Sequence, residues 1–329
     1  MKPIRRVLVG IRDLEAQALP AVRKGAALAE AFGAQLALFH AMAVPVTALP
    51  SVYRAGGFRN FERGLQQAAV NLLERIAEPL RSDKLDVRVE AHWDYPVHEA
   101  LVRQARRIKA DLVVAHAHAG RRLAPWLLHL TDWELLRTCP VPVLIVKSKR
   151  AWQRPRVLAA IDPVHAFAKP AGLDAEILKA GRQLCKALAG SLHAMHAYVP
   201  LHARHPQMIG VSPPVLARLA RTSEARARLA FERELRGTRI PPTRRHLRWG
   251  HPTDAIPRTA RALNAGLVVM GAVSRSGLRR IVIGNTAERI LGDLSCDVLV
   301  VKPARFVTSV SRTRRGIRFR VTNGLPPTT

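Results

Sequence analysis

The sequence has few cysteines, few aromatic residues and few acidic residues. Its three cysteines, Cys139, Cys185 and Cys296, are too few and too widely spaced for a disulfide framework or a CxxC metal site. Aromatic residues make up only 5% of the chain, and no helix-turn-helix or RNA-binding signature is present, which excludes an obvious means of reading bases. No apolar run approaches the roughly 18 residues of a membrane helix, and the amino terminus does not resemble a secretory signal. We therefore expect a cytoplasmic protein without a membrane span.

The shortage of acidic residues leaves a formal net charge of +29, from 53 Lys and Arg against 24 Asp and Glu. The excess is spread along the chain, although residues 304–329 contain six Arg and no acid. Most of the basic residues are Arg, which fits a genome that encodes its surface cations as Arg. Such a coat also attracts polyanions through counterion release, without sequence selectivity. We expect unspecific polyanion contact through this Arg-rich surface and no specific recognition of DNA.

An internal repeat divides the chain into two similar halves. The segment Leu112–Ala115 recurs as Leu267–Met270, 155 residues later, and four further segments recur in the same order. Trp93 and Trp249 also correspond, and we expect both to pack in a core. The repeat predicts two domains, over residues 1–149 and 150–303, followed by a flexible basic tail over 304–329.

Each half alternates short strands with helical segments. The strands are continuous Val, Ile and Leu runs, which is typical of strands buried on both faces, and the intervening helices imply parallel βαβ units. Longer helices are expected at 61–81 and 214–236. We therefore predict an α/β fold with two tandem, doubly wound, Rossmann-like domains. The last strands, Val143–Val146 and Val298–Val301, are expected to bring the halves together as an internal pseudo-dimer, and the whole chain could also form a homodimer.

A glycine-containing loop in the second half carries the clearest chemical pattern. It runs from Met270-Gly271 through Ser274 to Gly284-Asn285-Thr286, where a helix is expected to begin. Glycines let the backbone approach a ligand, and free N–H groups at a helix start bind phosphate. The same residues also fit an ordinary turn and helix cap. The pattern alone leaves both interpretations open.

The motif Gly271-x-x-Ser274, nine residues, Gly284-Asn285 resembles the Gly-x-x-Gly, nine residues, Gly-Ser/Thr loop of the universal stress protein family. Over residues 4–303 the duplicated chain resembles the tandem, two-domain (E-type) members. In nucleotide-binding members this loop holds the triphosphate and ribose of ATP, and an Asp corresponding to Asp162 lies against the adenosine. The resemblance implies a cofactor site made of Asp162, Met270, Gly271, Ser274, Gly284, Asn285 and Thr286.

The first half departs from this family pattern. His116, Arg122 and His129 stand at the positions of Gly271, Gly277 and Gly284, and Arg12 stands at that of Asp162. ATP is therefore expected in the second domain only, where Ser274 and Asn285 are themselves departures from the pattern. In the first domain we expect tightly packed side chains or another ligand.

Histidines form two further groups with possible chemistry. His116 and His118, with His129 nearby, are compatible with a zinc site, but a polar lining is the better interpretation because no Cys or carboxylate accompanies them. His40 and His196 correspond in the repeat, and a structural role is expected for both. The chain has no phosphate-binding P-loop, nucleophile elbow or dinucleotide fingerprint, so no catalytic residue is assigned.

These patterns lead to one functional hypothesis and two alternatives. The sequence is interpreted as a stress-response protein that binds a nucleotide or related metabolite in its second domain and signals through the arrangement of its domains, without turnover. The first alternative is a slow ATP-hydrolysing or phosphotransfer enzyme. The second is a stress protein that binds polyanions or partners and no nucleotide.

Overall fold

The computed structural model describes residues 2–43, 46–48, 58–117, 130–164, 172–199, 212–271, 285–303, 306–317 and 319–321. The chain forms two compact units. The first unit contains residues 3–139 together with 308–329, and the second unit contains residues 140–307 with the first two residues. The sequence repeat predicts different boundaries, with domains over residues 1–149 and 150–303 and a tail over 304–329. These boundaries stay a prediction.

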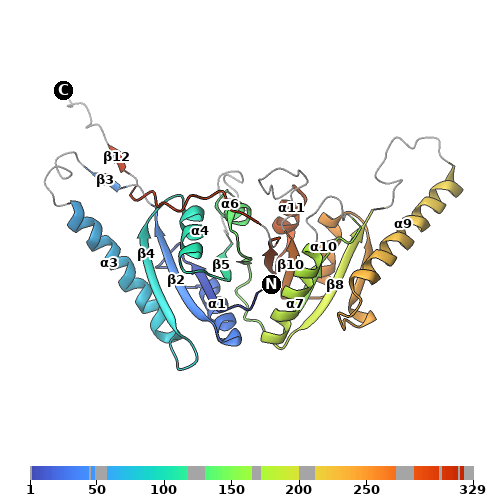
Figure 1. Ribbon diagram of the computed structural model, residues 1–329, viewed down its shortest axis with the longest axis horizontal. Helices are drawn as coiled ribbons and strands as arrows, with labels where there is room; N and C mark the ends of the chain where they lie inside the picture. Colours follow the sequence, from blue (N-terminus) through green and yellow to red (C-terminus); the bar gives the residue numbers. More distant parts are fainter. Residues whose placement is uncertain are drawn as a thin grey trace. The chain divides into compact units, whose positions relative to one another are not determined.

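The sheet of the first unit has the strand order β4-β2-β1-β5 with parallel neighbours. A two-stranded parallel pair, β3 with β12, lies in the same unit. Figure 1 shows α3 running alongside β4, on which it packs. The elements are β1 (Arg6–Gly10), α1 (Pro20–Phe32), β2 (Gln35–Met42), β3 (Val46–Ala48), α3 (Phe58–Ala77), η1 (Glu78–Leu80), β4 (Val87–Trp93), α4 (Val97–Arg107), β5 (Leu112–His116), α6 (Leu130–Thr138) and β12 (Phe319–Val321).

Helices cover both faces of this sheet, as the buried strands require. A Cβ atom added to Gly25 in α1 would lie 2.4 Å from Val9, whereas one added to Gly10 would lie 2.9 Å from Leu101 in α4. Because successive residues of a strand point to opposite faces, α1 and α4 pack on opposite sides of β1. Val7, Leu8 and Val9 are accordingly inaccessible to solvent.

The second unit has the strand order β6-β11-β10-β7-β8-β9, parallel except for β6 against β11. This mostly parallel sheet with packed helices confirms the predicted α/β fold class. Its elements are β6 (Val143–Val146), β7 (Arg156–Ala160), α7 (Leu173–Ala187), β8 (Ser191–Tyr198), α9 (Pro213–Glu234), η2 (Pro242–Arg244), β9 (Arg245–Trp249), α10 (Pro252–Ala262), β10 (Leu267–Gly271), α11 (Asn285–Asp293) and β11 (Asp297–Val301).

The last strands of the two repeats pair with each other inside the second unit. Leu144 of β6 lies opposite Leu299 of β11 in an antiparallel register, which confirms the predicted pairing. Asp297 anchors the chain just after β6, because its buried Oδ1 accepts hydrogen bonds from the N–H groups of Lys147 (2.8 Å) and Ser148 (2.9 Å). Two backbone donors thereby satisfy one oxygen of this buried carboxylate.

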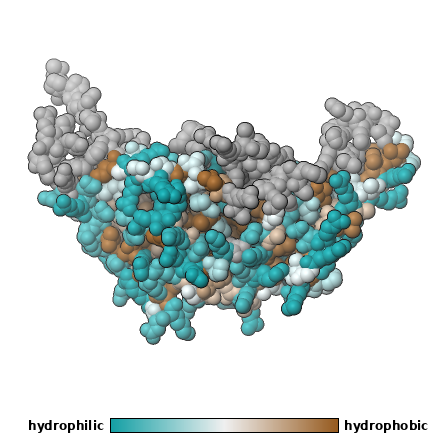
Figure 2. Space-filling view, in the orientation of Figure 1, coloured by the Kyte–Doolittle hydropathy of each residue, from teal (hydrophilic) through white to brown (hydrophobic). Residues whose placement is uncertain are grey.

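Helix boundaries follow ordinary stop signals. Helix α1 ends at Gly33, whose φ of 60° is a left-handed conformation that glycine adopts without strain. Helix α10 begins after His251, whose side chain accepts a hydrogen bond from the N–H of Thr253. Within the described ranges no helix is both long and apolar enough to cross a bilayer. Hydrophilic residues cover most of the face drawn in Figure 2, with hydrophobic residues in small patches.

Part of the carboxyl-terminal segment packs on the first unit. Val310 is 7% exposed and its carbonyl accepts a hydrogen bond from Arg106 Nη1 (2.8 Å). Five residues later the N–H of Arg315 donates to Asp94 Oδ1 (3.0 Å), and its guanidinium pairs with Glu99 (2.9 Å). Residues 308–317 are therefore anchored at two points, a docking that no sequence pattern indicated.

Candidate functional site

The candidate site lies at the carboxyl ends of β7 and β10. These strands are parallel neighbours, with Val268 opposite Leu158. In the sheet, β8 lies on one side of β7 and β10 lies on the other side, so the order of the strands reverses at β7. Such a reversal of strand order opens a crevice between connecting segments, and it is where open α/β sheets bind ligands.

Asp162 follows β7 by two residues and keeps an exposed carboxylate at this edge. Its N–H donates to Oδ1 of Asp174 (3.1 Å), a buried carboxylate in the first turn of α7. Its own side chain is 48% exposed, with Oδ1 3.7 Å from Nδ1 of His196. The backbone of Asp162 is thus held in place while its carboxylate is exposed to solvent. Asp174 was not singled out from the sequence, although an acidic residue just after Gly172 at a helix start is a recognisable signal.

His196 has a structural contact that accounts for its position. Its ring is 1% exposed in β8, and its Nδ1 lies 3.2 Å from the carbonyl oxygen of Ile161. In the first repeat, His40 Nδ1 lies 2.9 Å from the carbonyl oxygen of Ile11 in the same way. Both contacts tie the second strand of a repeat to the end of its first strand, in keeping with the expected structural role.

Gly271 is the last residue of β10, and close packing accounts for its lack of a side chain. A Cβ atom there would lie 2.6 Å from Cδ2 of Leu173 and 3.3 Å from Cδ1 of Ile177, both in α7. Met270 is 6% exposed, so its side chain belongs to the core and only its backbone is left for contact with a ligand. Gly271 ends β10 and Asp162 follows the end of the neighbouring strand β7, so both lie at the carboxyl edge of the sheet.

The remaining predicted site residues follow β10 along the chain. Asn285 and Thr286 form the first turn of α11, and their side chains lie outside the described residues, as do Ser274 and Gly284 entirely. Because α11 connects β10 to the parallel strand β11, its amino end faces the carboxyl edge of the sheet. The N–H groups of that turn are the donors that the sequence assigns to phosphate. The seven-residue site stays a prediction.

The equivalent edge of the first unit contains an open cavity. It measures about 350 Å³ and lies between the ends of β1 and β5 and the helices α1, α4 and α6. The sequence predicted tightly packed side chains or another ligand at this edge, and the described residues enclose a cavity there. Arg12 and Asp13 line the cavity where the second unit has Asp162, together with His98, whose pKa is lowered chiefly by burial.

No metal centre emerges from the residues that the structure describes. His116 is exposed at the end of β5, whereas His118 and His129 lie outside the described ranges. Within those ranges, no three His, Cys, Asp or Glu side chains gather closely enough to hold a metal ion. The hypothesis of a zinc site at this histidine cluster therefore has no support from the described part of the chain.

Comparison with known proteins gives a consistent result for both halves. The profile of the Universal stress protein family matches residues 3–147 and again residues 156–302. The Universal stress protein E homolog of Haemophilus influenzae is 28% identical over 276 residues, covering 80% of this chain and 88% of that protein. The Universal stress protein E of Photorhabdus laumondii is 25% identical over 295 residues, covering 87% of this chain and 91% of that protein.

A solved structure resembles the fold along nearly the whole chain. The crystal structure of a functionally unknown protein from Pseudomonas aeruginosa PAO1 matches with a TM-score of 0.70 at 26% identity. The match covers 91% of this chain and 93% of that protein. The similarity therefore extends over both repeats.

Proposed function

Because the chain belongs to the universal stress protein family and carries two tandem domains of it, we propose that its second domain binds ATP or a related nucleotide at the carboxyl edge of β7 and β10. The observation that carries the proposal is the position of Asp162 just after β7 and of Gly271 at the end of β10, where these parallel strands are neighbours and the strand order reverses. The exposed carboxylate is an acceptor for ribose hydroxyl groups, and the amino end of α11 supplies donors for phosphate.

The proposed mode of action is binding without turnover, in the cytoplasm, during a stress response. Efficient phosphoryl transfer needs a positioned cation and a group that orients the attacking nucleophile. Asp162 has a His neighbour, but His196 Nδ1 is engaged by the Ile161 carbonyl. A bound nucleotide would instead favour one arrangement of the two domains and so alter what the protein contacts.

Isothermal titration of the full-length protein with MgATP tests this proposal. Gly284→Glu places a carboxylate beside the expected phosphates and should abolish binding. His129→Glu makes the same change at the equivalent position of the first repeat and should leave the affinity intact. Equal loss in both variants, or no binding to the unmodified protein, would reject a nucleotide site in the second domain.

Measuring ATP hydrolysis by the unmodified protein, Gly284→Glu and His129→Glu distinguishes the enzymatic alternative from binding without turnover. Binding without phosphate release supports the sensor function. Release that disappears in Gly284→Glu and persists in His129→Glu would identify a slow ATPase instead.

A further inference from the structure

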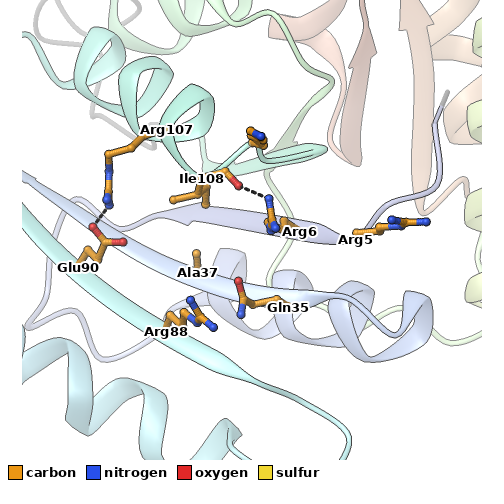
Figure 3. Close-up of a pocket in the computed structure, with 9 residues that line it drawn as sticks. Arg5, Arg6, Gln35, Ala37, Arg88, Glu90, Arg107 and Ile108 are labelled. Carbon is orange, nitrogen blue, oxygen red and sulfur yellow. Dashed lines mark hydrogen bonds and ion pairs between the residues drawn. The ribbon is translucent and has the colours of Figure 1, made fainter. Parts of the chain in front are cut away.

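A second region of a different character lies in the first unit and begins at the amino ends of its strands. Its first part is a cavity of about 620 Å³ among residues of β1, β2, β4 and the end of α4. Figure 3 shows Arg6 and Arg88 beside this cavity, with Arg107 reaching down from α4. The strands begin here, so the cavity is at the opposite edge of the sheet from the one that family members use for nucleotides.

The second part adjoins the first and is roofed by the carboxyl-terminal segment. It measures about 530 Å³ and shares Arg107 and Lys109 with the first cavity. Arg312 and Arg314 line it, brought there by the two anchor points of residues 308–317. We call the two cavities together the basic groove.

Positive charge in the basic groove exceeds what its acids neutralise. Nine Lys and Arg residues line it, against two carboxylates, Asp94 and Glu90. Both carboxylates are already engaged, Asp94 by Arg103 and Glu90 by Arg107. Among the described residues, no carboxylate lies within 4 Å of Arg312, Arg314 or Lys109.

The surplus positive charge contributes to lowered pKa values of neighbouring side chains. The pKa of Arg107 is lowered, first by burial and then by the positive charge of Arg314. The same two causes, in the same order, lower the pKa of His92. Like charges are therefore held close together in a partly desolvated place, an arrangement that an anion would relieve.

A buried donor without an acceptor belongs to a residue that lines the same cavity. Gln104 lines it and is 3% exposed. Its Oε1 accepts a hydrogen bond from Arg107 Nε (3.0 Å), so the other atom of the amide must be the NH₂ group. In the described part of the chain, that Nε2 has no hydrogen-bond partner. Buried polar groups are nearly always satisfied, so this donor calls for an acceptor beyond those that the described residues supply.

Ordinary surface effects account for only part of this arrangement. Basic residues at the end of a helix interact favourably with its dipole, which explains Arg106 and Arg107. The dipole does not explain why the distant residues Arg312 and Arg314 are brought to the same place, nor why Gln104 keeps an unsatisfied donor beside them.

We infer that the basic groove binds a linear multi-phosphate anion, held by Arg107, Arg312, Arg314 and the Nε2 of Gln104. Guanidinium forks bind phosphate oxygens in pairs, and a chain of phosphates can extend along two adjoining cavities. Single-stranded nucleic acid is the weaker candidate because it also needs stacking platforms. The rings that line the groove are Phe39, which is 2% exposed, and His92, which is engaged by Glu90.

Titration of the full-length protein with tripolyphosphate, and with a longer polyphosphate chain, tests the inference. The variant Arg312→Ser/Arg314→Ser removes two exposed side chains from the groove and should weaken binding at least tenfold. The control Arg218→Ser/Arg221→Ser removes the same charge from exposed positions of α9 in the second unit and should leave affinity within twofold. Gln104→Leu should weaken binding about fivefold without changing its salt dependence, because the lost donor is uncharged.

Each outcome of these titrations either supports or rejects polyphosphate binding in the basic groove. Equal weakening in the two double-Arg variants, or no binding near physiological salt, would show that charge alone acts and would overturn the site. Tighter binding of an oligonucleotide of equal charge, lost in Arg312→Ser/Arg314→Ser, would assign the groove to nucleic acid instead. If Gln104→Leu fails to fold, the exposed double variant still gives the answer. Gly284→Glu should not alter polyphosphate binding, which keeps this test independent of the nucleotide site.

Discussion

Arg103 and Asp94 form a two-pronged ion pair inside the first unit. Arg103 Nε and Nη2 lie 2.6 and 2.8 Å from the two carboxylate oxygens of Asp94, and the two side chains are 4% and 3% exposed. The same Asp94 Oδ1 accepts the backbone N–H of Arg315. One buried pair therefore fixes α4 and the carboxyl-terminal segment together.

Removing one charge of this pair is expected to be costly. Asp94→Asn leaves the Arg103 charge buried with only Glu99 to balance it, and should lower the free energy of unfolding by about 3 kcal/mol or more. Asp86→Asn is the control, since the ion pair of Asp86 with Arg88 (3.6 Å) is exposed and should contribute less than about 1 kcal/mol. Urea denaturation measures both. Similar losses in the two variants would contradict the importance given to the buried pair.

A methyl group at the end of β10 should disturb the packing of α7 beside the candidate nucleotide site. Gly271→Ala brings a Cβ to 2.6 Å from Leu173 and should destabilise the protein by about 1–3 kcal/mol. Gly292→Ala in α11 is the matched control, because nothing lies within 4 Å of its Cβ position and alanine favours helix. Thermal unfolding should show a lower melting temperature for the first variant only. An unchanged melting temperature in Gly271→Ala would mean that α7 is not closely packed there.

A pair of buried histidines predicts a loss of stability in acid. His193 Nδ1 lies 3.0 Å from His246 Nε2, and burial, then His246, Arg244 and Arg156, lower the pKa of His193 to about 4. Between pH 6.5 and 4 the unfolded chain then binds more protons than the folded protein, so the free energy of unfolding falls with falling pH. The loss from this group reaches about 3 kcal/mol.

The variant His193→Asn isolates this contribution. Its free energy of unfolding should depend less on pH over that range than that of the unmodified protein, with both referred to their values at pH 8. Parallel curves would show that other groups cause the acid sensitivity.

The fold could be predicted from the sequence because its signals are local. Runs such as Val268–Met270 are hydrophobic at every position, and the strands they form are buried on both faces. Because the two halves share one pattern, the elements inferred for one half were also expected in the other. A correspondence in sequence did not ensure the same environment, however: Trp93 is 9% exposed, as expected for packing, whereas Trp249 is 67% exposed on the edge strand β9. The packing role expected for Trp249 is wrong.

The contacts that are distant in sequence could not be predicted. Arg315 and Asp94 are 221 residues apart, and nothing in a run of exposed Arg residues indicates which carboxylate it will meet. The open cavity of the first unit was missed for a similar reason. It is lined by side chains of α4 and α6, such as Leu101 and Leu135, whose placement composition does not specify.

The role proposed for Asp162 can be separated from a general effect of charge. Asp162→Ala should weaken ATP binding roughly 10- to 100-fold, the equivalent of a lost hydrogen bond to a charged group. Asp13→Ala, one residue beyond the equivalent position of the first repeat, should change the affinity less than twofold. Isothermal titration gives both values. Equal affinities in the two variants would remove Asp162 from the site.

The most direct test of nucleotide binding by the second domain is mass spectrometry of small molecules released from the natively purified full-length protein. The expected result is a nucleotide, near one per chain, in the unmodified protein and in His129→Glu, and its absence from Gly284→Glu. The contradicting result is no nucleotide in any of the three, together with no rise in melting temperature when ATP is added.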